Sequence, residues 1–343
     1  MFRNVVAIER ALGTGIIISS SVPIPQRVQK RIRAFVEEYE SVLSRFRADS
    51  LVSRMASAEH GGEFEFPAWA GPLFALYGEF YAATRGAFDA CIGADLLALG
   101  YNNSVQFVPE SAASASSNIG SWANYRRALP VTWGNISRDS SSVTLCTNQP
   151  VQLDFGAAGK GYFVDLVTQI IKEDLGSDSP ADFDFLVNAG GDMRACFSEE
   201  NDQIKVALEN PFDTTQAVAV ASIASGALCA SSAARRRWKV KEASCLGKDA
   251  SGFESNLIAT HLINALDGIP ACDLCASWAY VPSKTCAFPT AYADALATAL
   301  FVSQESDLQK IVQTTSAEFA VISPNHALRK TRAFPAHFFA ESI

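Results

Sequence analysis

The stretch LDFGAAGKGYFVDLV, residues 153–167, constrains the fold of this 343-residue chain more than any other segment. It places three glycines and a lysine between an aspartate and an apolar run at helical spacing. Residues 150–155 predict a strand that delivers Asp154 into the glycine loop, and residues 162–176 predict a helix that ends at a glycine. Because glycine has no Cβ, such a loop lets another group approach the backbone, and Lys160 makes a phosphate the candidate.

Helical and strand patterns follow one another along the chain without a regular strand–helix–strand alternation. Helices are predicted over residues 26–46, 67–84 and 291–302 and from Ser306 onward. Strands are predicted at 15–22, 141–146, 217–232, 277–282 and 319–323, and 185–197 is expected to pair with 202–211. This mixture predicts an α+β fold, as a single domain over residues 1–343 or as two intimate subdomains with the active site between them.

The composition excludes several classes of protein. The hydrophobic fraction of 48% supports a real core, and the net charge of −8 argues against a nucleic-acid surface. No apolar run reaches the roughly 18 residues of a membrane helix. Glu9 and Arg10 interrupt the N-terminal apolar segment, and no lipobox-like cysteine precedes Cys91, so a cytoplasmic location is expected. The single close cysteine pair, in CDLC at 272–275, is too few ligands for a structural zinc site, and reduced thiols are expected.

The segment ADALATAL, residues 293–300, places a carboxylate and a hydroxyl four residues apart. On a helix Asp294 and Thr298 share one face, so they could supply two of the oxygen ligands of a Mg²⁺ site. The same pair also fits an acid near a helix N-terminus and a threonine bonded to its own turn. The residues alone leave both the metal site and the structural interpretation open, and they favour the structural one.

His261, Asp89 and Asp192 stand at breaks in apolar segments. His261 lies in an alternating apolar run before a Gly/Pro turn, where a histidine is more often a packed core residue than a base. GAFDACIG frames Asp89 with glycines, and NAGGDMRA breaks a strand on Gly-Gly-Asp. Taken alone, each of the two glycine-containing segments predicts only a turn.

Taken in order, the segments resemble the ApbE family of FAD:protein FMN transferases. FRADSLVSRMA, GAFDACIGADLLALGY, LDFGAAGKGYFVD, FLVNAGGDMRA, HLINALDGIPA and YADALATALFV are similar to successive family segments. The resemblance runs from residue 13 to about residue 302. It implies an ApbE-like, T-fold-like structure of mixed, largely antiparallel sheets with packed helices.

The resemblance also implies an activity and its residues. Members of the family use FAD and Mg²⁺ and move FMN onto a Thr or Ser of a flavoprotein with a D-x-x-[ST]-G-A-T-like motif, releasing AMP. It casts Asp294, Thr298 and the Ala157 carbonyl as metal ligands. Residues expected to line the FAD site are Ala87, Phe88, Asp89, Asp154 and Lys160. The resemblance implies that His261 is the catalytic base, a role that a pKa near neutrality would permit.

The chain departs from the family pattern at Ala56, Ala233, Asn264 and Asp267, where the family has Asn, Gly, Asp and Thr. These changes are expected around the flavin pocket and the acceptor approach. Two readings fit the run Arg235–Arg237: a solvated basic face or a phosphate contact. The resemblance leaves three activities open: the transferase, a Mg²⁺-dependent FAD pyrophosphatase that uses water, and a flavin-binding protein without turnover. The chain has no evident acceptor motif of its own, so the partner is expected to be another protein.

Overall fold

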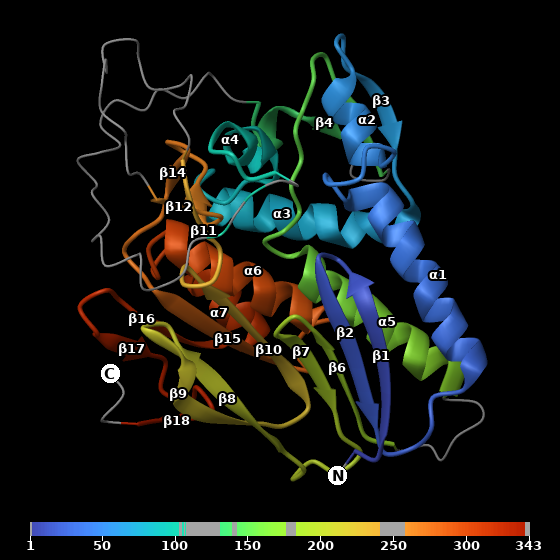
Figure 1. The fold of residues 1–343 in the computed structure, drawn as a ribbon, viewed down its shortest axis with the longest axis vertical. Coiled ribbons are helices and arrows are strands. Elements are labelled where there is room, and N and C mark those ends of the chain that lie inside the picture. The colour runs from blue at the N-terminus through green and yellow to red at the C-terminus, as the bar shows by residue number, and fades with distance from the viewer. Residues whose placement is uncertain are drawn as a thin grey trace.

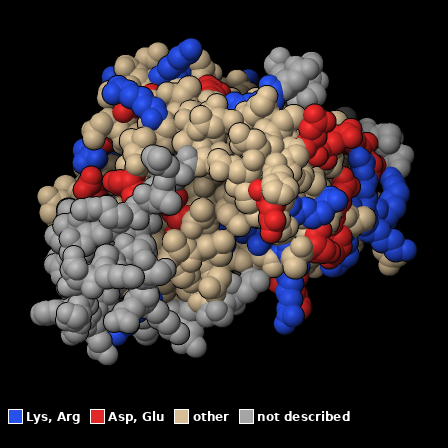
Figure 2. All heavy atoms as spheres, turned by 90° about the horizontal axis from the view of Figure 1, so that it is seen from above, with Lys and Arg blue, Asp and Glu red and all other residues tan. Residues whose placement is uncertain are grey.

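Helices and antiparallel strands form the layers of the α+β fold that the sequence predicts (Figure 1). The computed structural model describes residues 2–102, 105, 107, 131–138, 143–175, 183–240 and 258–339. Within these ranges no helix has both the length and the apolar character that crossing a membrane requires. On the face seen in Figure 2, Lys and Arg side chains are interspersed with Asp and Glu, and no broad basic patch forms there.

The central layer is an eight-stranded sheet in the order β1-β2-β6-β7-β10-β15-β16-β17. Its strands are β1 (Asn4–Ala11), β2 (Thr14–Ser20), β6 (Phe185–Ala189), β7 (Asp192–Cys196), β10 (Gly226–Ser232), β15 (Ala276–Pro282), β16 (Glu318–Ile322) and β17 (Leu328–Lys330). Neighbouring strands run antiparallel throughout the described sheet. Gly190 and Gly191, with φ of 65° and 105°, form the tight turn between β6 and β7, a backbone that glycine adopts most readily.

The expected pairing of residues 185–197 with 202–211 is wrong. Residues 185–197 fold back on themselves as the β6–β7 hairpin, because the Gly-Gly turn reverses the chain. The strand β8 (Ile204–Asn210) instead pairs with β9 (Asp213–Ile223), and β18 (Ala336–Phe338) completes a separate three-stranded sheet.

Alternating side chains of the central sheet pack into two different cores. Ala227 and Cys229 of β10 point toward α5 (Gly159–Leu175) and α6 (Pro289–Val302), whereas Leu228 points toward β8 and β9. This alternation follows from the two-residue repeat of a strand. The sheet is therefore covered by helices on one face and by the small sheet on the other (Figure 1).

The remaining helices enclose α5 and α6. The predicted helix at 26–46 is α1 (Gln26–Leu43), and the one at 67–84 is a 3₁₀ turn (Ala68–Ala70) followed by α3 (Gly71–Ala83). Phe35 of α1 stacks on Phe163 of α5 with 5.7 Å between ring centroids. The shorter elements are α2 (Leu51–Ser57), α4 (Gly93–Ala98), α7 (Gln309–Thr315), β3 (Gly62–Glu65), β4 (Ser137–Arg138), β5 (Thr144–Thr147), β11 (Arg237–Lys239), β12 (Ile258–Thr260), β13 (Ile263–Asn264) and β14 (Ile269–Pro270).

Residues 150–155, predicted as a strand, belong to no strand. Their amides bond to other segments: Val151 N–H donates to the Met55 carbonyl at 3.5 Å and Asp154 N–H to the Ala90 carbonyl at 2.7 Å. The segment therefore delivers Asp154 to the glycine loop as predicted, but without a strand ladder.

Gly161 brings α5 and α6 into close contact. A Cβ at this position would lie 2.3 Å from the Thr290 carbonyl oxygen and 2.7 Å from the Asp294 Cβ. The last glycine of the loop therefore allows the two helices to pack closely. From the sequence, we had expected it to let a ligand approach the backbone. At Gly159 a Cβ would meet its nearest atoms at an ordinary 3.6 Å.

Gly161→Ala should separate α5 from α6 and lower the free energy of unfolding by about 1–3 kcal/mol, the usual cost of overpacking. Gly159→Ala, two residues earlier in the same helix, is the matched control and should change stability little. Chemical denaturation of both variants measures the difference. Equal stability of Gly161→Ala and wild type would contradict the close contact.

Candidate functional site

A cavity of about 550 Å³ opens where α5, α6, β7 and β10 meet the segment that precedes α4. All residues predicted for the site line it: Ala87, Phe88, Asp89, Asp154, Ala157, Lys160, His261, Asp294 and Thr298. The volume lies within the range of small-molecule sites. Residues far apart in the sequence are thus brought to one place.

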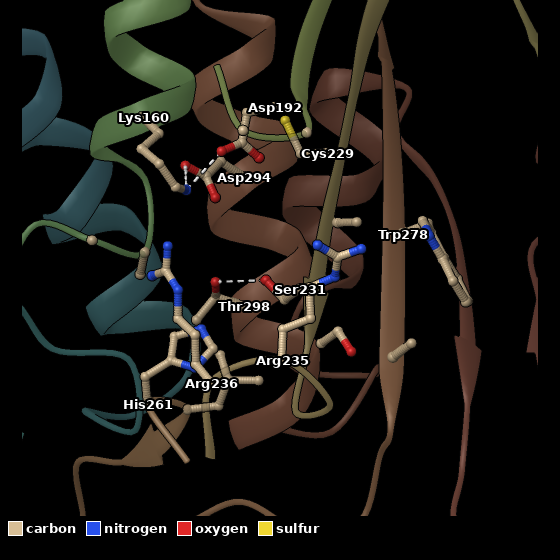
Figure 3. Close-up of a pocket in the computed structure, with 18 of the residues that line it drawn as sticks. Lys160, Asp192, Cys229, Ser231, Arg235, Arg236, His261, Trp278, Asp294 and Thr298 are labelled. Atoms are coloured by element: carbon tan, nitrogen blue, oxygen red, sulfur yellow. Dashed lines mark hydrogen bonds and ion pairs between the residues drawn. The ribbon is translucent and has the colours of Figure 1, made fainter. Parts of the chain in front are cut away.

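The centre of the cavity is an ion-pair cluster of Lys160, Asp192 and Asp294 (Figure 3). The Lys160 Nζ donates to Asp192 Oδ2 at 2.6 Å and lies 3.6 Å from Asp294 Oδ2. The Gly161 N–H also donates to Asp294 Oδ2, at 2.9 Å. Three elements, α5, β7 and α6, each contribute one charge, and two carboxylates face one lysine.

Burial and proximity shift the pKa values in this cluster. Burial, reinforced by the neighbouring Asp192, raises the pKa of Asp294 to about 7 against the opposing effect of Lys160. Burial alone would lower the pKa of Lys160, but the carboxylates of Asp192 and Asp294 outweigh it and raise that pKa above the ordinary lysine value. A cation that neutralises the carboxylates would relieve the crowding of negative charge.

Asp192 is the member of the cluster that sequence reasoning missed. The Gly-Gly-Asp break was recognised as a turn, but nothing in the sequence places residue 192 beside residue 160. The β6–β7 hairpin does so, and Asp192 is 2% exposed. The sequence signal was an aspartate directly after a glycine turn and before an apolar strand; the structure shows that it is buried, and a buried carboxylate needs a partner.

Thr298 extends the oxygen-rich face of α6 beyond Asp294. Its Oγ1 lies 3.1 Å from Ser231 Oγ of β10. The hydroxyl therefore bonds to another element, whereas one interpretation of the sequence had expected a bond to its own helical turn. Together these groups offer carboxylate and hydroxyl oxygens, the donors that Mg²⁺ prefers.

The donor set suits Mg²⁺ better than a soft metal. In the described part of the chain no group of three or more His, Cys, Asp or Glu side chains is placed to hold a metal. Mg²⁺ is usually bound by one or two carboxylates with waters and substrate phosphates, so Asp294 with Thr298 fits such a site. The Ala157 carbonyl, the third predicted ligand, belongs to a half-buried residue of the cavity wall.

His261 is half-buried in the cavity wall and has an unusually low pKa. Burial, together with the positive charges of Arg236 and Lys160, lowers it from 6.5 to about 3. The predicted near-neutral pKa is therefore wrong for the free protein, because the fold places two cations beside a desolvated ring. The ring is neutral at physiological pH, and its Nδ1 has no hydrogen-bond partner among the described residues.

Two of the predicted flavin-site carboxylates hold the loops that carry them. Asp154 accepts from Arg45 Nε at 2.5 Å and from Gly156 N–H at 2.6 Å. Asp89 accepts from the backbone N–H groups of Cys91 at 2.7 Å and Trp133 at 3.1 Å. Both line the cavity, and both shape its wall through backbone contacts.

The other two predicted flavin contacts are set by packing. The Phe88 ring is 3% exposed and lies 5.1 Å from the Tyr77 ring, centroid to centroid. The Ala87 carbonyl accepts from Ala265 N–H at 3.0 Å, which ties this wall to the His261 loop.

A second buried ion pair, Asp165 and Arg194, holds together the elements that carry the cluster. Asp165 of α5 accepts from Thr290 Oγ1 at 2.7 Å and from Ala291 N–H at 2.9 Å, which anchors the first turn of α6. Arg194 of β7 lies 3.5 Å from the same carboxylate. Burial raises the pKa of Asp165 to about 6, against the opposing effect of Arg194. The elements that carry Lys160, Asp192 and Asp294 are thereby held together.

The arginines of the basic run separate into different roles. Arg236 lines the cavity beside His261 (Figure 3), which favours the phosphate reading for this residue. Arg235 also lines the cavity, and it donates from Nε to Glu209 at 2.7 Å.

The departures from the family pattern do not line the described cavity. Ala56, Ala233, Asn264 and Asp267 are all outside its wall. The Asn264 and Asp267 side chains accept the Leu266 and Ile269 N–H groups, each at 2.9 Å. The last two substitutions therefore stabilise the turn after His261, as short Asx side chains commonly do.

Comparison with known proteins identifies the relatives of this fold. The model of the ApbE family matches residues 12–322. The ApbE protein of Thermotoga maritima is 19% identical, with a TM-score of 0.71 over 96% of this chain and 98% of that chain. The apo flavinyl transferase ApbE of Pseudomonas stutzeri is 21% identical, with a TM-score of 0.65 over 97% of each chain. The flavin transferase ApbE of Vibrio cholerae is 17% identical, with a TM-score of 0.63 over 95% and 96%. No curated protein matches the sequence.

The low pKa of His261 predicts a pH-dependent stability. An unfolded imidazole titrates near 6.5 and the folded one near 3, so between these values the unfolded state holds more protons. The stability contributed by the neutral ring is full above about pH 6.5 and is lost as the pH falls toward 3. Relative to His261→Gln, the wild type should lose about 1.4 kcal/mol of unfolding free energy per unit between about pH 6 and pH 4.

Denaturant titrations at several pH values measure this difference, with His60→Gln, at an exposed histidine, as the control. Wild-type and His261→Gln curves that stay parallel across the range would contradict a strongly lowered pKa.

Proposed function

The chain belongs to the ApbE family, and from this premise we propose that it is a Mg²⁺-dependent FAD:protein FMN transferase. The acceptor is a Thr or Ser hydroxyl of a flavoprotein with a D-x-x-[ST]-G-A-T-like motif. The acceptor oxygen forms a bond to the FMN phosphorus of FAD, and the bond from that phosphorus to the AMP oxygen breaks. The hydroxyl proton passes to a base, and AMP leaves. The solved relatives from Pseudomonas stutzeri and Vibrio cholerae are named flavin transferases, which supports the proposal.

One observation carries the proposal: cationic side chains that suit a phosphate and oxygen donors that suit Mg²⁺ face the same cavity. Lys160 and Arg236 supply positive charge, while Asp294 and Thr298 supply hard oxygen ligands. Breaking a pyrophosphate requires chiefly charge neutralisation and positioning, and little covalent help. This arrangement provides both, and an otherwise acidic protein concentrates its local cations where phosphates would lie.

The metal would be held by Asp294, Thr298 and the Ala157 carbonyl. When bound, Mg²⁺ supplies charge neutralisation at the phosphate oxygens. Lys160 then has two roles: it orients Asp192 through the 2.6 Å ion pair and presents its ammonium group to the incoming diphosphate.

His261 is the proposed base for the acceptor hydroxyl. In the free protein burial disfavours its protonated form most, and the positive charges of Arg236 and Lys160 add to this effect. An anionic diphosphate beside these two cations would offset that repulsion and raise the pKa of His261 toward the range useful for proton transfer. Its Nδ1 is buried and has no hydrogen-bond partner among the described residues.

One incubation separates this function from its alternatives. The protein is mixed with FAD, Mg²⁺ and a flavoprotein domain that carries the acceptor motif, and the acceptor mass and free AMP are measured. A gain of one FMN by the acceptor supports the transferase. Free FMN and AMP without labelling would show a pyrophosphatase, and bound FAD without either product would show a flavin-binding protein.

Asp294→Asn should reduce AMP release by on the order of 10²–10³-fold, the usual cost of removing one electrostatic stabiliser. The amide keeps the size of the carboxylate but lacks the charge that anchors the metal. Thr298→Val should instead raise the Mg²⁺ concentration for half-maximal rate, with a smaller loss at saturation, because a neutral ligand contributes less. Asp202→Asn, at an exposed carboxylate, is the control. Unchanged AMP release by Asp294→Asn at saturating Mg²⁺ would refute the metal assignment.

His261→Ala should reduce FMN transfer by roughly 10²–10⁴-fold, as expected for loss of a general base. Mg²⁺-dependent FAD binding should survive, because the imidazole is not a proposed ligand of the metal. Acceptor mass and flavin fluorescence quenching measure the two properties separately, with His60→Ala as the control. Transfer at the wild-type rate would exclude His261 as the base.

A further inference from the structure

Strand β10 extends beyond its partner on one side. It pairs with β15 along its whole length, Gly226–Ser232, but with β7 only over Gly226–Leu228. Strand β7 begins at Asp192, because the Gly190–Gly191 turn carries the chain back into β6. The last residues of β10 therefore form an internal open edge in the middle of the eight-stranded sheet.

The hydrogen-bond alternation shows which backbone groups face this edge. Ser283 N–H donates to the Ser225 carbonyl and Ala233 N–H to the Cys275 carbonyl, so the odd-numbered residues here bond toward β15. The even-numbered residues consequently point their N–H and C=O groups toward β7. Beyond Leu228 these are Ala230 and Ser232, whose edge groups have no recorded partner in the described part of the chain. Ala230 is exposed, although it lies in an inner strand of the sheet.

The open edge belongs to the cavity. Residues 229–232 all line it, as do Gly190 and Gly191, and a Cβ on Gly191 would meet nothing within 4 Å. One face of the gap leads to Thr298 and the charged cluster. The other leads to Leu228 and Trp278, which lies across the strands from Thr298 in Figure 3.

We propose that an extended segment of the acceptor protein binds in this gap as an added antiparallel strand on β10. The inference rests on the transferase function and names how its protein substrate is held. Strand addition obtains affinity from main-chain hydrogen bonds and specificity from alternating side-chain pockets. Here Ala230 and Ser232 supply the main-chain groups, and the two faces of the gap supply the pockets.

The spacing of the edge favours a peptide over the flavin ring. Ala230 and Ser232 are two residues apart, about 6.8 Å along a strand, and each presents one donor and one acceptor. A peptide backbone repeats its polar groups over this same distance. A single planar ring presents its polar edge to only one such residue. Ala87, Phe88 and Asp89, the residues expected at the flavin, line the same cavity from the segment that precedes α4 and not from β10.

The register places the reactive hydroxyl. In this sheet the β7 residue opposite Leu228 is Met193, and both point away from α5 and α6. An acceptor residue opposite Ala230 would likewise point toward the apolar face, and its neighbour opposite Ser231 would point toward Thr298. The target Thr or Ser therefore lies opposite Ser231, with its own N–H directed away from β10. Small or apolar residues flank it.

Ala230→Pro tests the edge directly. Proline removes the N–H that faces the gap and leaves the bonds to β15, because residue 230 makes none with that strand. The probe is a rhodamine-labelled synthetic peptide with the D-x-x-[ST]-G-A-T sequence, measured by fluorescence anisotropy on the intact protein. Its dissociation constant should rise about tenfold more than that of FAD, as expected for loss of a main-chain hydrogen bond and of close strand approach. Lys330→Pro is the matched control, since its N–H also points outward, on the outer edge of the same sheet.

Methylated peptides test the same edge on the wild-type protein, whether or not Ala230→Pro folds. N-methylation of either residue flanking the target should weaken binding about tenfold, whereas N-methylation of the target residue should not. Equal binding of all three peptides would overturn the proposal. So would an Ala230→Pro variant that loses FAD and peptide affinity equally, because the edge would then belong to the flavin.

Mass measurement of the acceptor separates this inference from the proposed function. Wild type that binds the peptide with the predicted methylation pattern but transfers no FMN would refute the function and leave the docking site. Transfer by Ala230→Pro with the wild-type peptide KM would refute the docking site and leave the function.

Discussion

The contact between α5 and α6 at Gly161 is the constraint on which the site depends. Only a residue without a Cβ fits against the Thr290 carbonyl and Asp294, and the approach lets the Gly161 N–H bond to Asp294 Oδ2. This bond aligns the α6 face that carries Asp294 and Thr298. One residue earlier, Lys160 leaves the same turn of α5 and reaches both carboxylates. Helix packing and site geometry thus have the same origin.

The free site holds charges that a diphosphate and a cation would rebalance. Two buried carboxylates share one lysine, and a neutral histidine lies beside two cations. Burial is the largest cause of the raised pKa of Asp294 and of the lowered pKa of His261, and neighbouring like charges add to both shifts. A metal ion would compensate the carboxylates, and phosphates would compensate Lys160 and Arg236. Asp165 and Arg194 keep the three supporting elements in place behind the cluster.

Periodicity predicted the α+β class and most helices, because it is a local property of the sequence. The residues that line the cavity were predicted by the resemblance of ordered motifs to the ApbE family. The sequence did not predict that Gly161 serves helix packing, since that depends on the α6 backbone. Asp192 was missed as a partner of Lys160 because a hairpin brings it there. The pKa of His261 was misjudged because burial and Arg236 come from the fold. The open edge of β10 is equally hidden, because it arises from where a neighbouring strand begins.

The internal gap in the sheet and the charged cluster together explain how one cavity could serve two substrates. The loops that Asp89 and Asp154 hold form one part of the cavity wall, and the backbone of β10 forms another part. The charged cluster lines the same cavity, where the FMN phosphorus would pass from AMP to the acceptor hydroxyl.

A crystal structure of the protein with FAD and Mn²⁺, a substitute for Mg²⁺ with usable anomalous scattering, tests the metal and diphosphate sites together. We expect an anomalous peak within bonding distance of Asp294 and Thr298, with the FAD diphosphate in contact with Lys160. A peak elsewhere, or a diphosphate bound away from Lys160 and Asp294, would contradict this expectation.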